Sequence, residues 1–460
     1  MITHNGFMDA SAIKPDKRDI LLLAVLCFIY FAVRIPYINF PEKPNIEEIY
    51  YVKGAATYLS PSGLEPIPSH PPLAKYIIAA FMKLFGDNPI GWRAAPLLFG
   101  FLIIIITYFF SLFLYKSKAG AFFSGFLLIF DFLFFTISRM AILDIFLTFF
   151  IITGLFFACI YYKSRDIKNS VFFNWWLFLS AISIALAVSC KLSGLSGLLA
   201  IIVIFAALYL LNRKKISFKL LFFTFLFYVV IIIFIYLLVH IPVLLRGAKL
   251  AYLLYTENFK LHYIEQYKHK HITGIWKWIL AIHPFWFVAK RSADNQTFRL
   301  IGGMGGAMFW WGFLLFLIIS IIEIIKKKQE PLIVNILCYL SLYLFWLSSF
   351  NFYKGHFYFK GGFIWYMLPC VPFMAILVSR YLGEAWKTKI GKINVIIYLA
   401  SIVTFFGLFY PILSCIPIPK SYLDNIFSIS LNLLILIVLI INAQIFTMPI
   451  INYFKKQEQL

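Results

Sequence analysis

The chain has 460 residues, of which 62% are hydrophobic and only 13% are charged, and its formal net charge is +22. An ordinary soluble domain is roughly 45–50% apolar and about 25% charged, so this composition excludes a single soluble globular domain and a disordered chain. Apolar stretches long enough to cross a bilayer as helices recur along the sequence. We therefore expect an all-α, multi-pass integral membrane protein.

The excess of basic residues fits the same interpretation. In a soluble protein, 41 Lys and Arg against 19 Asp and Glu would suggest nucleic-acid binding. Here the bases lie mostly between apolar stretches, which indicates membrane topology and contact with anionic lipids, and no nucleic-acid partner. The six cysteines include no CxxC pair, so neither a disulfide framework nor a zinc site is predicted.

About twelve spanning helices are predicted from the apolar stretches. Every second connection between them is short and basic, which is typical of cytoplasmic loops and places the N-terminus in the cytoplasm. The predicted spans cover residues 20–38, 94–115, 119–137, 140–162, 172–190, 193–211, 218–242, 302–325, 331–350, 361–380, 393–413 and 425–447. We take residues 1–460 as one transmembrane domain.

Two long segments, 39–93 and 243–301, fall on the opposite, outer face of the predicted topology. Loops of this length are usually functional or disordered. Both segments contain apolar periodicity, so they are expected to form amphipathic helices on the membrane surface.

The first of these segments contains an acidic pair at a predicted helix start. Asn45 followed by Glu48 has the spacing of a capping box, which puts Glu47 and Glu48 in the first turn of a helix. One interpretation is that both acids complement the helix dipole, and the other is that one carboxylate acts as a general base at the membrane face. The local sequence leaves both interpretations open.

Further along this segment, prolines and polar residues mark two more helix starts. His70-Pro71-Pro72 predicts an extended stretch, and Lys75 follows on a helix. Asp87-Asn88-Pro89 predicts a turn, after which Trp92-Arg93 opens the next span. A lone histidine such as His70 is more often structural than catalytic.

Charged residues also occur inside or beside the spans: Asp131, Arg139, Asp144 and Lys191. Charges at membrane depth are costly and are functional candidates by default. The alternative is internal pairing, for example of Arg139 with Asp144. The sequence alone does not decide between these two possibilities.

These motifs together resemble the protein O-mannosyltransferases, which are polyprenyl-phosphate-dependent membrane glycosyltransferases of the GT-C class. The resemblance covers about residues 20–380 and is most specific in the first 200. It is carried by EEIYYVKGA at 47–55, HPPLAKYIIA at 70–79, LFGDNPIGWR at 84–93, SRMAILDIFL at 138–147 and CKLSGL at 190–195, with a weaker echo in FIWYMLPCVPF at 363–373.

The resemblance implies a GT-C bundle that transfers a sugar, mannose, with inversion from a polyprenyl (dolichyl) phosphate to Ser/Thr hydroxyls of proteins. It implies Glu47 as the general base, with Glu48 orienting the acceptor or the loop. Arg139, Lys191 and Arg93 are expected at the donor phosphate, and the pocket is expected to include His70, Lys75, Asp144 and Tyr51. No metal or other cofactor is expected.

Two departures from the family pattern qualify this expectation. The family usually has Asp-Glu where this chain has Glu47-Glu48, one methylene longer at the first acid. The luminal accessory domain of eukaryotic members has no counterpart in 243–301, which implies a prokaryotic plasma-membrane enzyme with its site facing outside. A lipid-glycosylating relative, such as an aminoarabinose transferase, and a secondary transporter are the alternatives.

Overall fold

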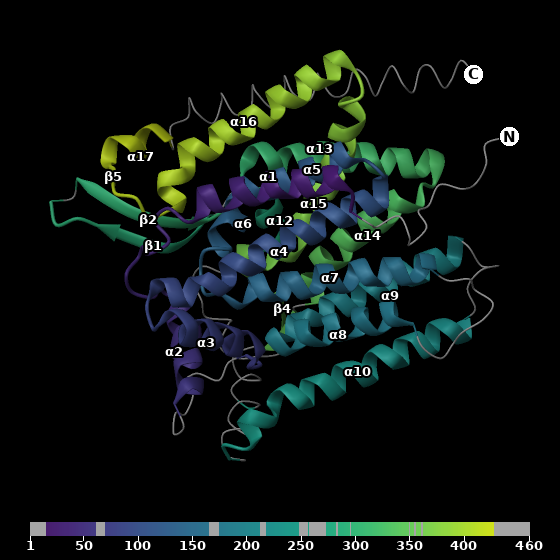
Figure 1. Cartoon of the computed structure of the whole chain (residues 1–460), viewed down its shortest axis with the longest axis horizontal. Coiled ribbons are helices and arrows are strands. Elements are labelled where there is room, and N and C mark those ends of the chain that lie inside the picture. The colour runs from purple at the N-terminus through teal and green to yellow at the C-terminus, as the bar shows by residue number, and fades with distance from the viewer. Residues whose placement is uncertain are drawn as a thin grey trace.

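The computed structural model describes residues 15–60, 70–164, 174–211, 218–247, 256, 273–281, 284–294, 296–348, 350–353, 356–359 and 362–426. It is a bundle of long helices that run side by side (Figure 1). The helices are α1 (Lys17–Arg34), α2 (Glu48–Leu59), α3 (Leu73–Phe85), α4 (Pro89–Tyr115), α5 (Lys118–Ile129), α6 (Phe132–Ile137), α7 (Leu143–Ser164), α8 (Trp175–Cys190), α9 (Leu195–Leu211), α10 (Phe218–Leu244), α12 (Ile275–Ile279), α13 (Ala307–Lys327), α14 (Glu330–Leu344), α15 (Val371–Ala385), α16 (Lys389–Leu413) and α17 (Lys420–Ile426), with 3-10 helices η2 (Leu192–Gly194), η5 (Phe345–Ser348) and η6 (Ile364–Cys370).

Within the described ranges, eight helical segments are long and apolar enough to cross a membrane, and α5 and α8 are shorter apolar helices. The predicted multi-pass helical bundle is confirmed. The most enclosed span is the one formed by η6 and α15, whereas α10 is the least enclosed. The predicted span at 425–447 lies almost entirely outside the described residues, so the count of twelve stays a prediction.

The predicted span at 119–137 is interrupted. Asp131 separates α5 from α6, and its carboxylate accepts hydrogen bonds from the backbone N–H of Phe134 at 2.7 Å and from Trp310 Nε1 at 2.7 Å. The Asp131 side chain therefore starts a new helix, because it satisfies a free N–H group of the first turn. This charge within an apolar stretch has a structural role.

Short strands accompany the helices. Strands β1 (Phe285–Arg291) and β2 (Thr297–Gly303) pair antiparallel, and β5 (Ile418–Pro419) extends the sheet in the order β1-β2-β5. A second hairpin pairs β3 (Phe350–Tyr353) with β4 (His356–Phe359). The expectation of amphipathic helices throughout 243–301 is therefore wrong at β1 and over residues 297–301 of β2.

Gly302 and Gly303 form the end of β2, where they pair with Trp286 and Phe285 of β1, instead of beginning the next span. A Cβ at Gly303 would come within 2.7 Å of the Phe287 ring, so only glycine permits this close approach. The following helix, α13, begins at Ala307 rather than at residue 302.

The first outer segment folds as predicted into helices. Helices α2 and α3 and the β1–β2 hairpin gather at the same end of the bundle, on the left of Figure 1. Asn88 caps α4 by accepting hydrogen bonds from the N–H groups of Ile90 at 3.0 Å and Gly91 at 3.1 Å, and Pro89 occupies the first helical turn. The end of the bundle that carries α2 and α3 also carries the predicted functional residues.

Candidate active site

The capping box predicted at Asn45 is present. Asn45 Oδ1 accepts hydrogen bonds from the backbone N–H groups of Glu47 and Glu48, each at 3.1 Å. In return, Glu48 Oε2 accepts from the Asn45 backbone N–H at 3.2 Å and from Asn45 Nδ2 at 2.8 Å. This reciprocal pattern fixes the start of α2 and gives the two acids different surroundings.

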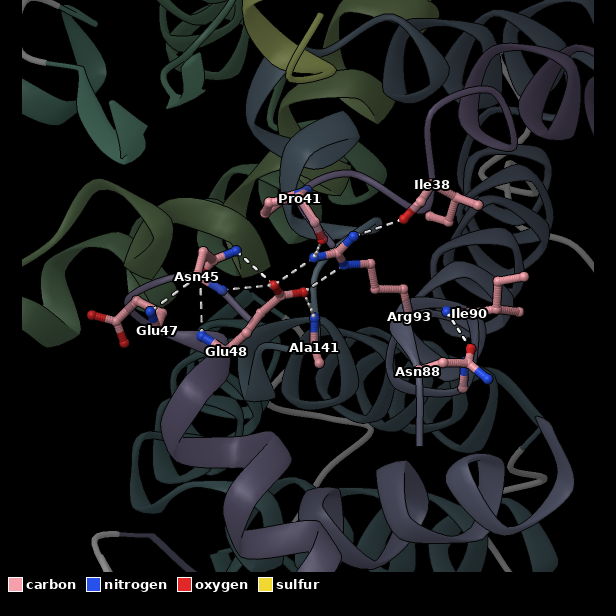
Figure 2. A network of polar contacts seen from close by, with 10 residues as sticks. Ile38, Pro41, Asn45, Glu47, Glu48, Asn88, Ile90, Arg93 and Ala141 are labelled. Atoms are coloured by element: carbon pink, nitrogen blue, oxygen red, sulfur yellow. Dashed lines mark hydrogen bonds and ion pairs between the residues drawn. The ribbon is translucent and has the colours of Figure 1, made fainter. Parts of the chain in front are cut away.

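Glu48 is fully buried and forms a two-pronged ion pair with Arg93 (Figure 2). Arg93 Nε lies 2.9 Å from Glu48 Oε1 and Arg93 Nη2 lies 2.9 Å from Oε2, while the Ala141 N–H donates to Oε1 at 3.0 Å. Arg93 also donates to the carbonyl oxygens of Ile38 at 2.7 Å and Pro41 at 2.9 Å. The two Glu48 oxygens therefore accept five hydrogen bonds within the protein, which leaves little capacity for a hydrogen bond from a substrate.

Arg93 was predicted beside the donor phosphate. Its guanidinium instead ties the start of α4 to the first outer loop and to Glu48. This placement favours a positioning role for both residues, and a direct contact of Arg93 with phosphate stays a prediction.

Glu47 has the opposite environment. Its side chain points away from the Glu48–Arg93 network (Figure 2) and is half-buried. Burial raises the pKa of the Glu47 carboxyl from 4.5 to about 7, while nearby Lys191 lowers this pKa and Asp144 raises it. A carboxylate with a pKa near the working pH is well matched to accepting a proton from a substrate.

Lys191 and Asp144 form a buried ion pair close to Glu47. Lys191 Nζ lies 2.9 Å from Asp144 Oδ1 and 3.1 Å from Oδ2. The same ammonium lies 4.4 Å from the centroid of the Tyr366 ring. Asp144 therefore pairs with Lys191 and not with Arg139, the partner considered from the sequence.

Tyr51 lies one turn along α2 from Glu47 and faces the same cluster. Burial raises its pKa well above 10, and Glu47, Asp144 and Tyr366 raise it further because each adds negative charge nearby when ionised. The rings of Tyr51 and His70 have centroids 6.1 Å apart. Tyr51 therefore joins the cluster as a neutral hydroxyl group.

His70 and Lys75 border this cluster at the start of α3. Lys75 is almost fully buried, and its Nζ donates a hydrogen bond to the His70 carbonyl oxygen at 2.9 Å. This bond supports the turn that carries His70, and a role of Lys75 in the pocket stays a prediction.

Four predicted residues therefore come together, namely Glu47, Tyr51, Asp144 and Lys191. Sequence reasoning missed Tyr366, which lies on η6 and stacks on Trp346 with ring centroids 4.2 Å apart. Its signal was the motif FIWYMLPCVPF, which resembled the family only weakly and did not single out one residue.

Arg139 lies in a different environment. Its Nε donates to the Arg34 carbonyl oxygen at 3.0 Å, its Nη2 to the Pro36 carbonyl oxygen at 2.8 Å, and its Nη1 to Ser414 Oγ at 3.1 Å. These bonds cap the C-terminal end of α1, where a positive charge is favourable. Among the described residues no carboxylate lies within 4.0 Å of Arg139. Its expected role at the donor phosphate stays a prediction.

Helix α2 is also held at its far end. Arg246, just beyond α10, donates hydrogen bonds to the carbonyl oxygens of Thr57 at 3.0 Å and Tyr58 at 3.2 Å. Its guanidinium carbon lies 5.3 Å from the centroid of the Tyr58 ring. Arg246 therefore links α2, which follows Glu47, to the end of α10.

Metal ligation has no evident candidates in the part of the chain that the structure describes. There, no group of three or more His, Cys, Asp or Glu side chains has a geometry that could hold a metal ion.

The chain is similar in sequence to known protein mannosyltransferases. Residues 87–244 match the family model for dolichyl-phosphate-mannose-protein mannosyltransferases. A polyprenol-phosphate-mannose–protein mannosyltransferase of Corynebacterium glutamicum is 24% identical, with the alignment covering 83% of this chain and 87% of the relative.

Two solved structures share the fold. The S. cerevisiae protein O-mannosyltransferase Pmt1-Pmt2 complex, bound to the sugar donor, gives a TM-score of 0.65 at 12% identity and covers 91% of this chain and 93% of the yeast chain. ArnT from Cupriavidus metallidurans, bound to undecaprenyl phosphate, gives a TM-score of 0.56 at 15% identity. This match covers 93% of this chain and 74% of the ArnT chain. The sequence matches show that the chain is similar to protein mannosyltransferases, and the solved structures show that it shares the fold of membrane glycosyltransferases.

Proposed function

We propose that this protein transfers mannose from a polyprenyl-phosphate-linked donor to Ser or Thr hydroxyls of protein acceptors. The family match and the names of the relatives support this donor and this class of acceptor. The single observation that carries the chemistry is Glu47, a half-buried carboxyl with a pKa of about 7 beside a buried Lys–Asp pair.

In this proposal Glu47 acts as the general base. Its carboxylate takes the proton of the acceptor hydroxyl as that oxygen attacks the anomeric carbon of mannose. The bond between the anomeric carbon and the phosphate oxygen breaks, and the polyprenyl phosphate leaves with the electron pair. The attack comes from the face opposite the leaving group, so the configuration of the sugar inverts. A phosphate is a weakly basic leaving group, so no general acid is required.

Two cations are proposed to stabilise the departing phosphate. Lys191 is nearest to the base, and its charge is shared with Asp144. Arg139 has three neutral acceptors and no carboxylate within ion-pair distance among the described residues, so an anion would compensate its charge. Fixed charges of this kind act by electrostatic stabilisation of the transition state.

Glu48 and Arg93 are proposed to position the base. Their ion pair links the start of α2 to α4 and to the loop before α2, so Glu47 projects from a fixed backbone. Such pre-organisation matters because small displacements of a catalytic group strongly reduce the rate.

The protein is an integral membrane protein with several spans, and we propose that the site faces the outside of a prokaryotic plasma membrane. The support is the distribution of bases. Three lysines lie at the ends of spanning helices, on the face of the bundle away from α2 and α3. They are Lys116, Lys326 and Lys389. Cytoplasmic loops carry such residues, so α2 and α3 would lie on the outer side.

The acceptor is tested with purified protein and two acceptor classes. The protein is incubated with polyprenyl-phosphate-mannose and either a Ser/Thr peptide or a membrane glycolipid, and the products are analysed by mass spectrometry. We expect one mannose on the peptide and none on the lipid. A matched peptide with alanine at every Ser and Thr should stay unmodified. Modification of the lipid with an unmodified peptide would overturn the proposed acceptor.

Arg246→Ala is expected to lower kcat on the order of tenfold with a smaller change in the KM for the donor, because the α2 helix loses its attachment while the donor contacts remain. Arg246→Lys should restore part of the rate. Arg18→Ala, which removes an exposed arginine at the opposite end of the bundle, is the control and should behave like the parent. An unchanged kcat in folded Arg246→Ala would remove Arg246 from this role.

A further inference from the structure

The ring of Tyr366 lies between the Lys191 ammonium and the indole of Trp346. Lys191 Nζ is 4.4 Å from the centroid of the Tyr366 ring. The rings of Tyr366 and Trp346 are stacked, with centroids 4.2 Å apart and planes inclined by 15°. Since Trp346 covers one face of the Tyr366 ring, the ammonium lies against the other face. A cation in this position is attracted by the negative face of the aromatic ring.

The neighbours of Tyr366 fix its ring in this orientation. The planes of Trp278 and Phe363 are nearly perpendicular to the Tyr366 ring, at 89° and 88°. A Cβ at Gly362 would lie 2.6 Å from ring carbon Cδ2, so the backbone passes directly against the ring. Tyr366 is buried and belongs to η6. Its ring is therefore a fixed surface beside Lys191.

Lys191 has two acids close to it. Its Nζ lies 2.9 Å and 3.1 Å from the two carboxylate oxygens of Asp144, and Glu47 is near enough for Lys191 to lower its pKa. A lysine ammonium is a compact charge on a flexible four-carbon stem, so one ion pair alone does not fix its position. An ammonium that moved onto Glu47 would hold the base in an ion pair and leave the phosphate without its nearest cation. The Tyr366 ring closes one side of the ammonium and confines it to Asp144.

We propose that Tyr366 is a positioning residue for the transfer reaction. Its ring and the Asp144 carboxylate hold the Lys191 ammonium between them, at the place where Lys191 meets the departing phosphate. Tyr366 acts through Lys191 and needs no contact of its own with the sugar or the phosphate. This inference rests on the proposed function, in which Lys191 stabilises that phosphate.

The kinetic test compares Tyr366→Leu with Tyr366→Phe. Leucine removes the aromatic face, so we expect kcat for mannose transfer to fall on the order of tenfold, with a smaller change in the KM for the donor. Phenylalanine keeps the aromatic face and should retain most of the parent rate. Added to Lys191→Gln, Tyr366→Leu should cause little further loss, because the ammonium on which the ring acts is already gone. An equal loss from Tyr366→Leu with and without Lys191 would overturn the proposal.

A second readout does not depend on activity. Lys191 is almost fully buried, so acetic anhydride should acetylate it slowly in the parent and several times faster in Tyr366→Leu, as measured by mass spectrometry of peptides. Lys75, which is also almost fully buried, should react equally in both proteins and serves as the internal control. Unchanged acetylation of Lys191 in folded Tyr366→Leu would contradict confinement by the ring. A parent that transfers no mannose would overturn the proposed function, while the acetylation rates still decide whether the ring confines Lys191.

Tyr339→Leu is the matched control for the loss of a buried, stacked tyrosine. Tyr339 stacks on Tyr343 with ring centroids 5.7 Å apart, and in the described part of the chain no lysine or arginine lies over its ring. This variant should lose stability without the loss of kcat, and a comparable fall in kcat would overturn the specific role of Tyr366. Should Tyr366→Leu fail to fold, Trp346→Leu removes the support behind the ring and should produce the same changes at a smaller size. Parent-like kinetics and Lys191 acetylation in Trp346→Leu would then contradict the proposal.

Discussion

Replacing Glu47 by glutamine is expected to lower kcat by about 10²–10⁴-fold, the usual contribution of a general base. The substitution nearly preserves the size of the side chain and removes its ability to accept a proton. Binding of the polyprenyl-phosphate donor should persist, because none of the cations placed at the phosphate is changed. Glu47→Asp should retain activity, since it restores the acid that the family usually has at this position.

A second prediction for Glu47→Gln concerns the stability of the fold. The folded-state pKa of Glu47 is raised from 4.5 to about 7, so burying this group disfavours folding increasingly as pH rises from about 4.5 to 7. Gln cannot ionise and does not carry this cost. Glu47→Gln should therefore unfold at a higher temperature than the parent at pH 8, with a smaller difference at pH 5. If the ionised Glu47 carboxylate stabilised the fold, Glu47→Gln would instead unfold at a lower temperature than the parent at pH 8.

Glu48→Gln is the control for the assignment of roles. It should lose stability, because Glu48 accepts five hydrogen bonds and faces the Arg93 guanidinium. A parent-like rate in Glu47→Gln together with an inactive but stable Glu48→Gln would reverse the two roles.

The second large effect concerns the Glu48–Arg93 pair. Arg93→Met is expected to lower the free energy of unfolding by roughly 3–5 kcal/mol, the usual cost of leaving one partner of a buried pair without its counter-charge. The side chains are only 1% and 0% exposed, so water does not replace the lost contacts. Thermal or denaturant unfolding in detergent micelles measures the change.

A double mutant shows how much of the lost stability comes from leaving the Glu48 charge without its partner. In Arg93→Met/Glu48→Gln no buried charge is left alone, so this protein should be more stable than Arg93→Met itself. The matched control is Lys387→Met, which breaks an ion pair whose side chains are 65% and 59% exposed and should change stability little. A parent-like stability for Arg93→Met would show that the pair does not hold the loop.

Local signals in the sequence predicted local structure well. The capping box at Asn45 and the turn at Asp87-Asn88-Pro89 correctly mark the starts of α2 and α4, because each motif involves residues only two or three positions apart. Most spans were predicted for a similar reason, since length and hydrophobicity of one stretch suffice. Asp131 was the exception, because a buried acid can either break a helix or sit within one.

Contacts between distant segments were harder to predict. Glu48 and Arg93 are 45 residues apart, and Asp144 and Lys191 are 47 apart, so nothing in either local sequence identifies the partner. The resemblance brought Glu47, Glu48, Arg93 and Lys191 to attention as a group and gave the two acids different roles, but it did not show that Glu48 pairs with Arg93. The β1–β2 hairpin was missed because a short apolar run has no periodicity that separates a strand from a helix.

The measurement that tests the central claim most directly is the pH dependence of kcat/KM for mannose transfer to the peptide, in the parent and in Lys191→Gln. A base must be deprotonated to act, so the parent rate should rise with pH to a plateau with a midpoint of about 7. Lys191 lowers the pKa of Glu47 more than Asp144 raises it, so removing Lys191 should move this midpoint upward. A profile that is flat from pH 5 to 9, or a midpoint near 4.5 that does not move in Lys191→Gln, would contradict Glu47 as the base.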